Sequence, residues 1–114
     1  MGNIILCSQQ DVNHFLWTEV AGTLAISGND LTDLTPLNTL TSVGRNLIFA
    51  GNTLLPNLDG LAALMEVDSS IYFFRNEALT NVNRLSSLTS IGGDLSFYEN
   101  VALINSGGSQ HSPP

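Results

Sequence analysis

One pattern recurs four times along this chain, and it constrains the fold more than any other feature of the sequence. Two hydrophobic residues in alternation are preceded by an aliphatic residue and followed by an asparagine, always at the same distances. The alternating pairs begin 23, 24 and 24 residues apart. They are Leu24/Ile26, Leu47/Phe49, Ile71/Phe73 and Leu95/Phe97, with Val20, Val43, Val67 and Ile91 before them and Asn29, Asn52, Asn76 and Asn100 after them. A fixed period of about 20 to 50 residues is typical of repeat architectures.

Leucines recur at every third position between these landmarks, as in the segment from Leu55 to Leu64. This spacing is neither the period of a strand nor that of a helix. It predicts turns and short 3₁₀-like segments whose aliphatic side chains all point to one interior. Glycines follow two of these segments, and Asp68-Ser69 takes their place after the segment that begins at Leu55. We expect Gly44, Gly92 and Gly93 to provide positive φ angles at a corner.

The N-terminal segment departs from this pattern. Ile4 and Leu6 resemble the alternating pairs and predict a first strand. Ser8 with Asp11 resembles a capping box, which predicts that a helix begins here. The apolar residues that follow at helical spacing are Val12, Phe15, Leu16 and Val20. We expect this helix to cover the end of the hydrophobic core, with Trp17 packed at its rim.

These patterns predict a mainly β protein, a right-handed β-helix or leucine-rich-repeat-like solenoid of about four coils of 23–24 residues with a short N-terminal capping helix. Three segments are expected. Residues 1–21 form the first strand and the capping helix, and residues 22–104 form the repeats. Residues 105–114, which are rich in Gly, Ser and Pro, are expected to be disordered.

The pattern G-x-L-x-I-x-x-N-x-x-L-x-x-L-x-x-L-x-x-L-x-x-[IV]-G-G, which spans roughly residues 2 to 104, resembles the receptor L domain. This family includes domains of the insulin and epidermal growth factor receptor ectodomains and multi-repeat microbial surface proteins. The resemblance implies a β-solenoid, an extracellular or cell-surface location, and a role in binding or adhesion instead of catalysis. It does not specify a ligand.

Composition excludes several classes of partner. The net charge is −7, Lys is absent, and the three arginines are far apart in the sequence. Without a basic patch the chain lacks the main source of affinity for nucleic acid, and an anionic membrane surface would repel it. No apolar run is long enough to predict a membrane-spanning helix. The N-terminus lacks the features of a signal peptide, so we expect any export signal to lie outside this chain.

Aromatic residues gather at the outward positions of the predicted strands. Successive strands would place equivalent outward residues in ladders about 4.8 Å apart. Exposed aromatic residues with a polar rim are typical of interaction surfaces, although aromatic pairs also stabilise sheets. The candidate ligand-binding residues are Ile48, Tyr72, Phe74 and Tyr98, with Arg75 and Glu99 at their edge.

The four asparagines after the alternating pairs are predicted to form a structural ladder. An inward asparagine at a corner can satisfy backbone groups that water does not reach. Neither a metal site nor a catalytic site is predicted, because Cys7, His14 and His111 supply too few ligands and no oriented nucleophile. No cofactor is expected. Polysaccharide lyases also use β-helices, but the single outward acid Asp94 does not provide their cluster of acids and bases.

The sequence therefore predicts a non-catalytic extracellular module that binds a protein or a glycan through an exposed strand face. An alternative is a structural spacer or a truncated repeat array that associates with itself through an uncapped C-terminal coil. The sequence does not distinguish these two hypotheses.

Overall fold

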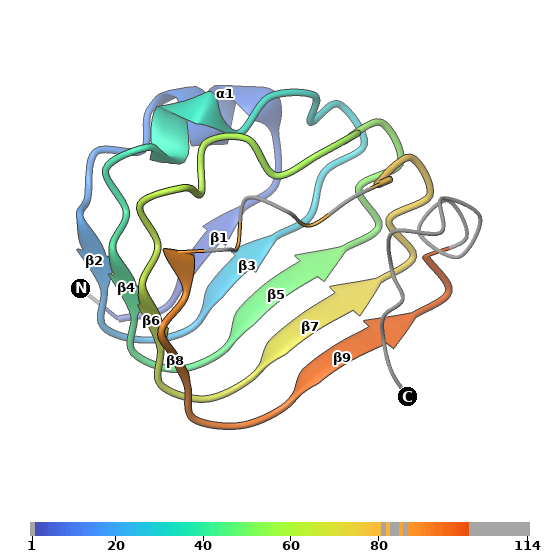
Figure 1. Cartoon of the computed structure of the whole chain (residues 1–114). Helices are drawn as coiled ribbons and strands as arrows, with labels where there is room; N and C mark the ends of the chain where they lie inside the picture. The colour runs from blue at the N-terminus through green and yellow to red at the C-terminus, as the bar shows by residue number, and fades with distance from the viewer. Residues whose placement is uncertain (1, 81, 83–84, 86, 101–114) are drawn as a thin grey trace.

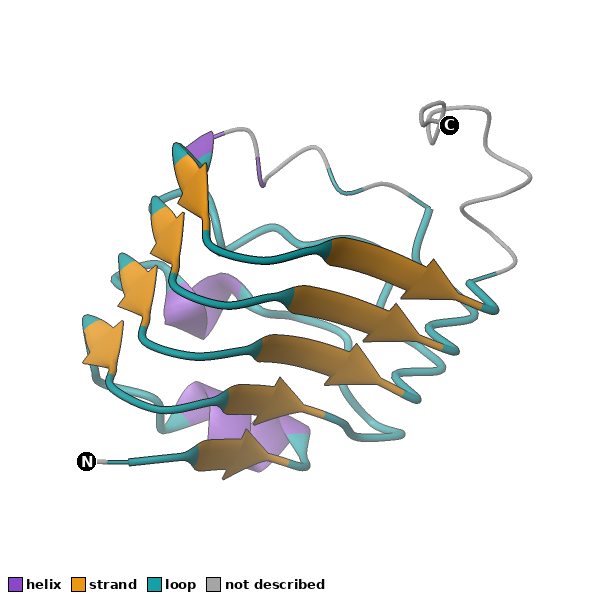
Figure 2. Ribbon diagram, turned by 90° about the horizontal axis from the view of Figure 1, so that it is seen from below, coloured by secondary structure: helices purple, strands orange, loops and turns teal. Residues whose placement is uncertain are grey.

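Parallel strands in register dominate the structure, a computed structural model that describes residues 2–80, 82, 85 and 87–100. Five strands form one sheet in the order β1-β3-β5-β7-β9 (Figure 1). They are β1 (Ile4–Leu6), β3 (Leu24–Ile26), β5 (Leu47–Ala50), β7 (Ile71–Phe74) and β9 (Leu95–Tyr98). Four two-residue strands form a second parallel sheet: β2 (Glu19–Val20), β4 (Ser42–Val43), β6 (Glu66–Val67) and β8 (Ser90–Ile91). The strands of each sheet lie in successive layers (Figure 2).

The register follows the sequence pattern. Leu24 lies opposite Leu47, and Ile26 lies opposite Phe49. The next two pairings join equivalent positions in the same way, Phe49 to Phe73 and Phe73 to Phe97. The three phenylalanine rings stack on the inner face of the sheet, with centroids of neighbouring rings 4.8 and 4.9 Å apart. The alternation of side chains along each strand therefore gives the five-stranded sheet an apolar inner face and a separate outer face.

The leucines at every third position fill the core, as their spacing predicts. Those between β3 and β4 and between β5 and β6 are almost completely buried: Leu31, Leu34, Leu37, Leu40, Leu55, Leu58, Leu61 and Leu64. The backbone around them forms short turns. Leu37 N–H donates to Leu34 O in a 3₁₀ turn (Thr35–Leu37), and Leu61 N–H donates to Leu58 O at 3.1 Å.

The fold class expected from the sequence, a right-handed β-helix or leucine-rich-repeat-like solenoid, is wrong. Over the part of the chain that the structure describes, it is a compact α/β fold of two parallel sheets, with five and four strands, and one short helix. The described residues do not wind into a closed solenoid. The expectation of a repeat array is therefore wrong as well. The physical reason lies in the leucine-rich segments. They form the turns that their spacing predicts, but their backbone bonds mainly within these turns, so strand pairing among the described residues joins two separate sheets and does not close a coil.

The N-terminal helix is α1 (Gln9–Asn13), and it contacts β1 and the 3₁₀ turn. Ser8 caps it as predicted, because its hydroxyl accepts from Asp11 N–H at 3.1 Å. The Asp11 carboxylate accepts from Cys7 N–H at 3.0 Å. Leu16, which was expected on the buried face of the helix, is instead 84% exposed. The helix ends at Asn13, so helical spacing no longer determines the direction of Leu16.

The corner glycines serve a purpose different from the one predicted. Positive φ occurs at Gly51 and Gly60, and not at Gly44, Gly92 or Gly93. A Cβ atom at Gly44 would overlap the carbonyl oxygen of Ala21, and one at Gly92 would overlap that of Asp68. These corners therefore need glycine because neighbouring backbone segments approach closely.

Candidate binding surface

The outer face of the five-stranded sheet carries a row of aromatic side chains at the ends of its last strands. Ala50, Phe74 and Tyr98 occupy in-register positions on β5, β7 and β9. The Phe74 and Tyr98 rings lie 5.2 Å apart with planes 14° from parallel. The Tyr72 ring lies 5.7 Å from that of Phe74, with planes 12° apart. The predicted outward aromatic ladder is therefore present, and its rings share one orientation.

A step in side-chain size along this row creates an open depression. Tyr98 lies against Phe74 from the β9 side, whereas the β5 side of Phe74 faces the single methyl group of Ala50. A methyl group is too small to cover a phenyl ring, so space remains beside it. The depression has a volume of about 600 Å³. Its lining residues are Ser27, Ala50, Gly51, Phe74, Arg75, Tyr98 and Glu99.

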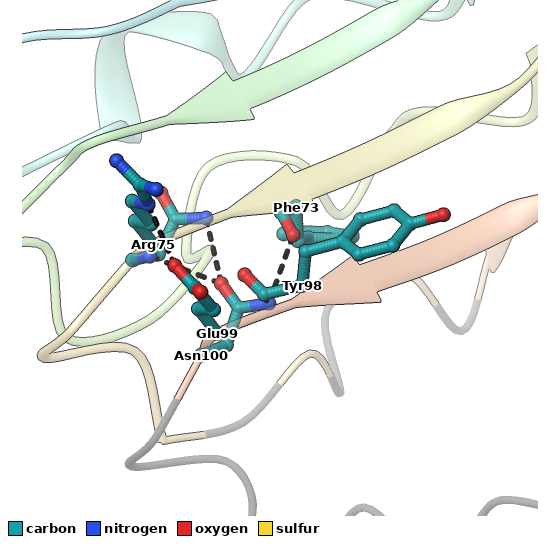
Figure 3. Close-up of polar contacts among 6 residues, drawn as sticks. Phe73, Arg75, Tyr98, Glu99 and Asn100 are labelled. Atoms are coloured by element: carbon teal, nitrogen blue, oxygen red, sulfur yellow. Dashed lines mark hydrogen bonds and ion pairs between the residues drawn. The ribbon is translucent and has the colours of Figure 1, made fainter.

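Arg75 and Glu99 line the same depression as the aromatic residues that precede them. Consecutive strand residues normally point to opposite faces of a sheet. Here the backbone is left-handed, with φ angles of 55° at Arg75 and 58° at Glu99, so the chain turns directly after the strand. Phe74 and Arg75, and likewise Tyr98 and Glu99, therefore meet at one site. Arg75 Nε donates to Glu99 Oε1 at 2.6 Å (Figure 3).

Stability alone does not account for arginine and glutamate at these two positions. A left-handed conformation costs a residue with a Cβ atom about 1–2 kcal/mol, and glycine avoids this cost, as at the equivalent Gly51. The Arg75–Glu99 pair is exposed, with side-chain exposures of 74% and 67%. An exposed ion pair contributes about 0–1 kcal/mol. The free-energy cost of the left-handed backbone at two positions thus exceeds the stabilisation that the ion pair contributes. Such backbone strain is typical of functional sites.

The structure brings together four of the six predicted ligand-binding residues. Phe74, Tyr98, Arg75 and Glu99 line the depression, whereas Ile48 and Tyr72 lie one alternation earlier on their strands and outside its lining. Prediction from the sequence did not include Ser27, Ala50 and Gly51 in the site. The signal was present in the sequence, because small residues precede the bulky ones in both ladders: Ser27 and Ala50 in one, and Gly51 in the next.

The asparagine ladder lies beneath this surface and is buried, as predicted, for Asn52, Asn76 and Asn100. Asn76 Nδ2 donates to Phe49 O and to Asn100 Oδ1 at 3.0 and 2.9 Å. Asn76 Oδ1 accepts from Asn52 Nδ2 at 2.8 Å. Asn100 Nδ2 donates to Phe73 O at 2.8 Å (Figure 3). The ladder satisfies strand-end carbonyls and holds the backbone under the depression.

Asn29 is not part of this ladder, and its predicted inward position is wrong. Its side chain is exposed, and the backbone N–H of the buried Gly28 donates to Asn52 Oδ1 at 2.9 Å instead. The ladder keeps a spacing of 24 residues, which leads from Asn52 back to Gly28. The first sequence interval is one residue shorter, so pattern alignment selected the wrong residue.

The other residues that the sequence analysis considered lie outside the lining of the depression. No group of three or more His, Cys, Asp or Glu side chains there could hold a metal ion. Cys7 is exposed and free, and His14 Nδ1 lies 2.8 Å from Gln10 O. Trp17 packs edge-on against Phe15 at 5.7 Å, as expected for the rim of the helical segment. His111 and the tail expected to be disordered, residues 105–114, lie outside the described residues.

None of the described helices is long and apolar enough to cross a membrane. Comparison of the chain with family models, curated proteins and solved structures finds no match. The resemblance to receptor L domains therefore remains a hypothesis from the sequence motif.

Proposed function

We propose that this chain is a non-catalytic binding module whose ligand site is the depression on the outer face of the five-stranded sheet. The observation that carries this proposal is the left-handed backbone at Arg75 and Glu99, which places an ion pair beside the half-buried ring of Phe74 and the exposed ring of Tyr98. Exposed aromatic residues beside a polar rim are typical of recognition surfaces. The ligand is a protein or a glycan, and the setting suggested by the receptor-L-like motif is extracellular.

The rigidity of the site supports binding. Gly51 N–H donates to Phe74 O at 2.8 Å, and Arg75 N–H donates to Tyr98 O at 2.9 Å. These bonds fix the backbone from which the lining side chains project. A preorganised surface loses less conformational entropy when a ligand binds.

A panel of cell-surface glycans and proteins tests this function. Wild-type protein is compared with the double variant Phe74→Ala/Tyr98→Ala, and circular dichroism and a urea denaturation curve verify the fold. We expect wild type to bind at least one panel member and the double variant to lose that binding. Ile5→Ala is the matched control, because Ile5 is 66% exposed on β1 of the same sheet and lies outside the depression. Equal binding by the double variant would contradict the proposal.

A second candidate function is self-association through the β9 end of the sheet. Leu95 and Phe97 occupy core-facing positions but are 46% and 43% exposed, whereas the equivalent Ile71 and Phe73 are completely buried. An exposed apolar edge strand is a template for pairing with another chain. The opposite end of the sheet differs, because α1 contacts β1 there.

Sedimentation equilibrium of the whole chain tests the second candidate. Self-association predicts a mass that rises with concentration from about 10 μM to 1 mM and a monomeric Phe97→Lys variant, because a charge on an edge strand opposes pairing. A wild-type protein that stays monomeric over this range would exclude this function and leave the depression as the remaining candidate.

A further inference from the structure

We infer that the depression binds a neutral oligosaccharide, with one sugar ring stacked on the β5-facing side of Phe74 and its hydroxyl groups bonded to Arg75 and Glu99. This inference rests on the proposed function and names the chemical class of its ligand. The main evidence is the difference in size between the two in-register neighbours of Phe74. Tyr98 stacks on one side of its ring, and the small Ala50 leaves the other side open.

The polar groups of the depression match sugar hydroxyls. An arginine side chain only donates hydrogen bonds and an ionised carboxylate only accepts them, whereas a hydroxyl does both. Two neighbouring hydroxyls of one ring can therefore bond to Arg75 and Glu99 together. The C–H groups on the flat side of a β-linked pyranose are apolar and carry partial positive charge, which suits the negative face of an aromatic ring.

The charge balance favours a neutral ligand over an anionic one. Glu99 already compensates the charge of Arg75 at 2.6 Å, so the depression offers no free cation. The net charge of the chain is −7, which repels sulfated or carboxylated glycans at long range.

A peptide main chain fits this site less well. Extended peptides gain most of their affinity by adding a strand to a sheet edge. The depression lies on the sheet face, and the N–H groups of Gly51 and Arg75 already donate to Phe74 O and Tyr98 O. A bound peptide backbone would find no free main-chain donors at these two positions.

The test titrates neutral tetrasaccharides of β-linked glucose, N-acetylglucosamine, mannose and galactose into the whole chain, followed by calorimetry and by NMR of both partners. We expect at least one of them to bind with a Kd in the millimolar range or below, with upfield shifts of the sugar C–H protons that lie over a ring. Phe74→Ala should weaken binding at least about tenfold, which corresponds to about 1.4 kcal/mol. Ile5→Ala should leave it unchanged.

Ala50→Phe is a second variant that separates binding from folding. Aromatic residues already occupy the in-register positions Phe74 and Tyr98, so a phenylalanine at position 50 extends the stack and fills the depression. We expect it to abolish saccharide binding while the urea midpoint stays the same or rises.

The outcomes separate this inference from the proposed function. Saccharide binding that survives Ala50→Phe, or the failure of all four saccharides, would overturn the inference. If a protein or peptide then binds and Phe74→Ala abolishes that binding, the binding function stands with a different ligand class. If nothing on either panel binds, both fail.

Discussion

At the scale of single residues, burial separates two asparagines that the sequence pattern treats as equivalent. Asn76 is completely buried and bonds to Asn52, Asn100 and the carbonyl of Phe49. Asn29 is exposed. An amide whose partners have no access to water contributes far more than one that water can replace, because its removal leaves buried polar groups unpaired.

This contrast gives a matched pair of variants. Asn76→Ala should lower the free energy of unfolding by about 3 kcal/mol, since it leaves the Phe49 carbonyl and two neighbouring amides with fewer partners. Asn29→Ala should change it by less than about 0.5 kcal/mol. Urea denaturation of both variants provides the measurement, and similar losses would show that the buried ladder does not carry the stability assigned to it.

Gly51 provides a test of backbone strain without steric interference. Its φ angle is 67°, and a Cβ atom there would meet no other atom within 4 Å. Gly51→Ala should therefore cost about 1 kcal/mol from the left-handed conformation alone. Gly51→Asn should cost less, because asparagine tolerates this conformation better. Thermal or urea unfolding that ranks alanine above asparagine in stability would contradict this account.

At the scale of elements, the corners that lead into the longer strands depend on close contact between chain segments. Gly44 follows β4, and its N–H donates to Val20 O at 2.6 Å. The position of its missing Cβ is occupied by the Ala21 carbonyl oxygen. A side chain there must push the two corners apart and weaken the pairing of β2 with β4.

We therefore expect Gly44→Ala to destabilise the protein by about 2 kcal/mol, a typical cost of overpacking. Gly2→Ala is the control, because a Cβ atom at Gly2 meets nothing within 4 Å. Denaturation curves that shift equally for both variants would indicate that the corner can relax at no cost.

At the scale of the whole molecule, the order of strands predicts a gradient of local stability. β5 has a paired strand on each side, whereas β9 lies at the end of the sheet order. Buried, doubly paired strands open mainly through global unfolding, and end strands open locally at lower cost. Amide hydrogen exchange followed by NMR should therefore be slowest in β5 and faster in β9. Uniform protection of the amides in all five strands would contradict this gradient. Slower amide exchange in β9 at higher protein concentration would favour self-association.

Much of the local structure was predictable from the sequence. Alternation identified the strands that begin at Leu24, Leu47, Ile71 and Leu95, and the spacing of the leucines identified the buried core. Ser8 indicated the helix start. These features follow from the strand period, from apolar burial and from end-capping, all of which act over a few residues.

The overall fold and the shape of the site were decided by tertiary structure. The predicted solenoid class was wrong because the strands pair into two separate parallel sheets, while the leucine-rich segments between them bond mainly within their own turns. Gly28, and not Asn29, occupies the buried position next to Asn52, because its N–H donates to the Asn52 side chain 24 residues away. The sequence determined which side chains face outward, because alternation along a strand is local. Only the tertiary structure determined that Ala50 leaves one side of Phe74 open and that Arg75 and Glu99 turn toward the same depression, because register and backbone strain arise when distant strands pack.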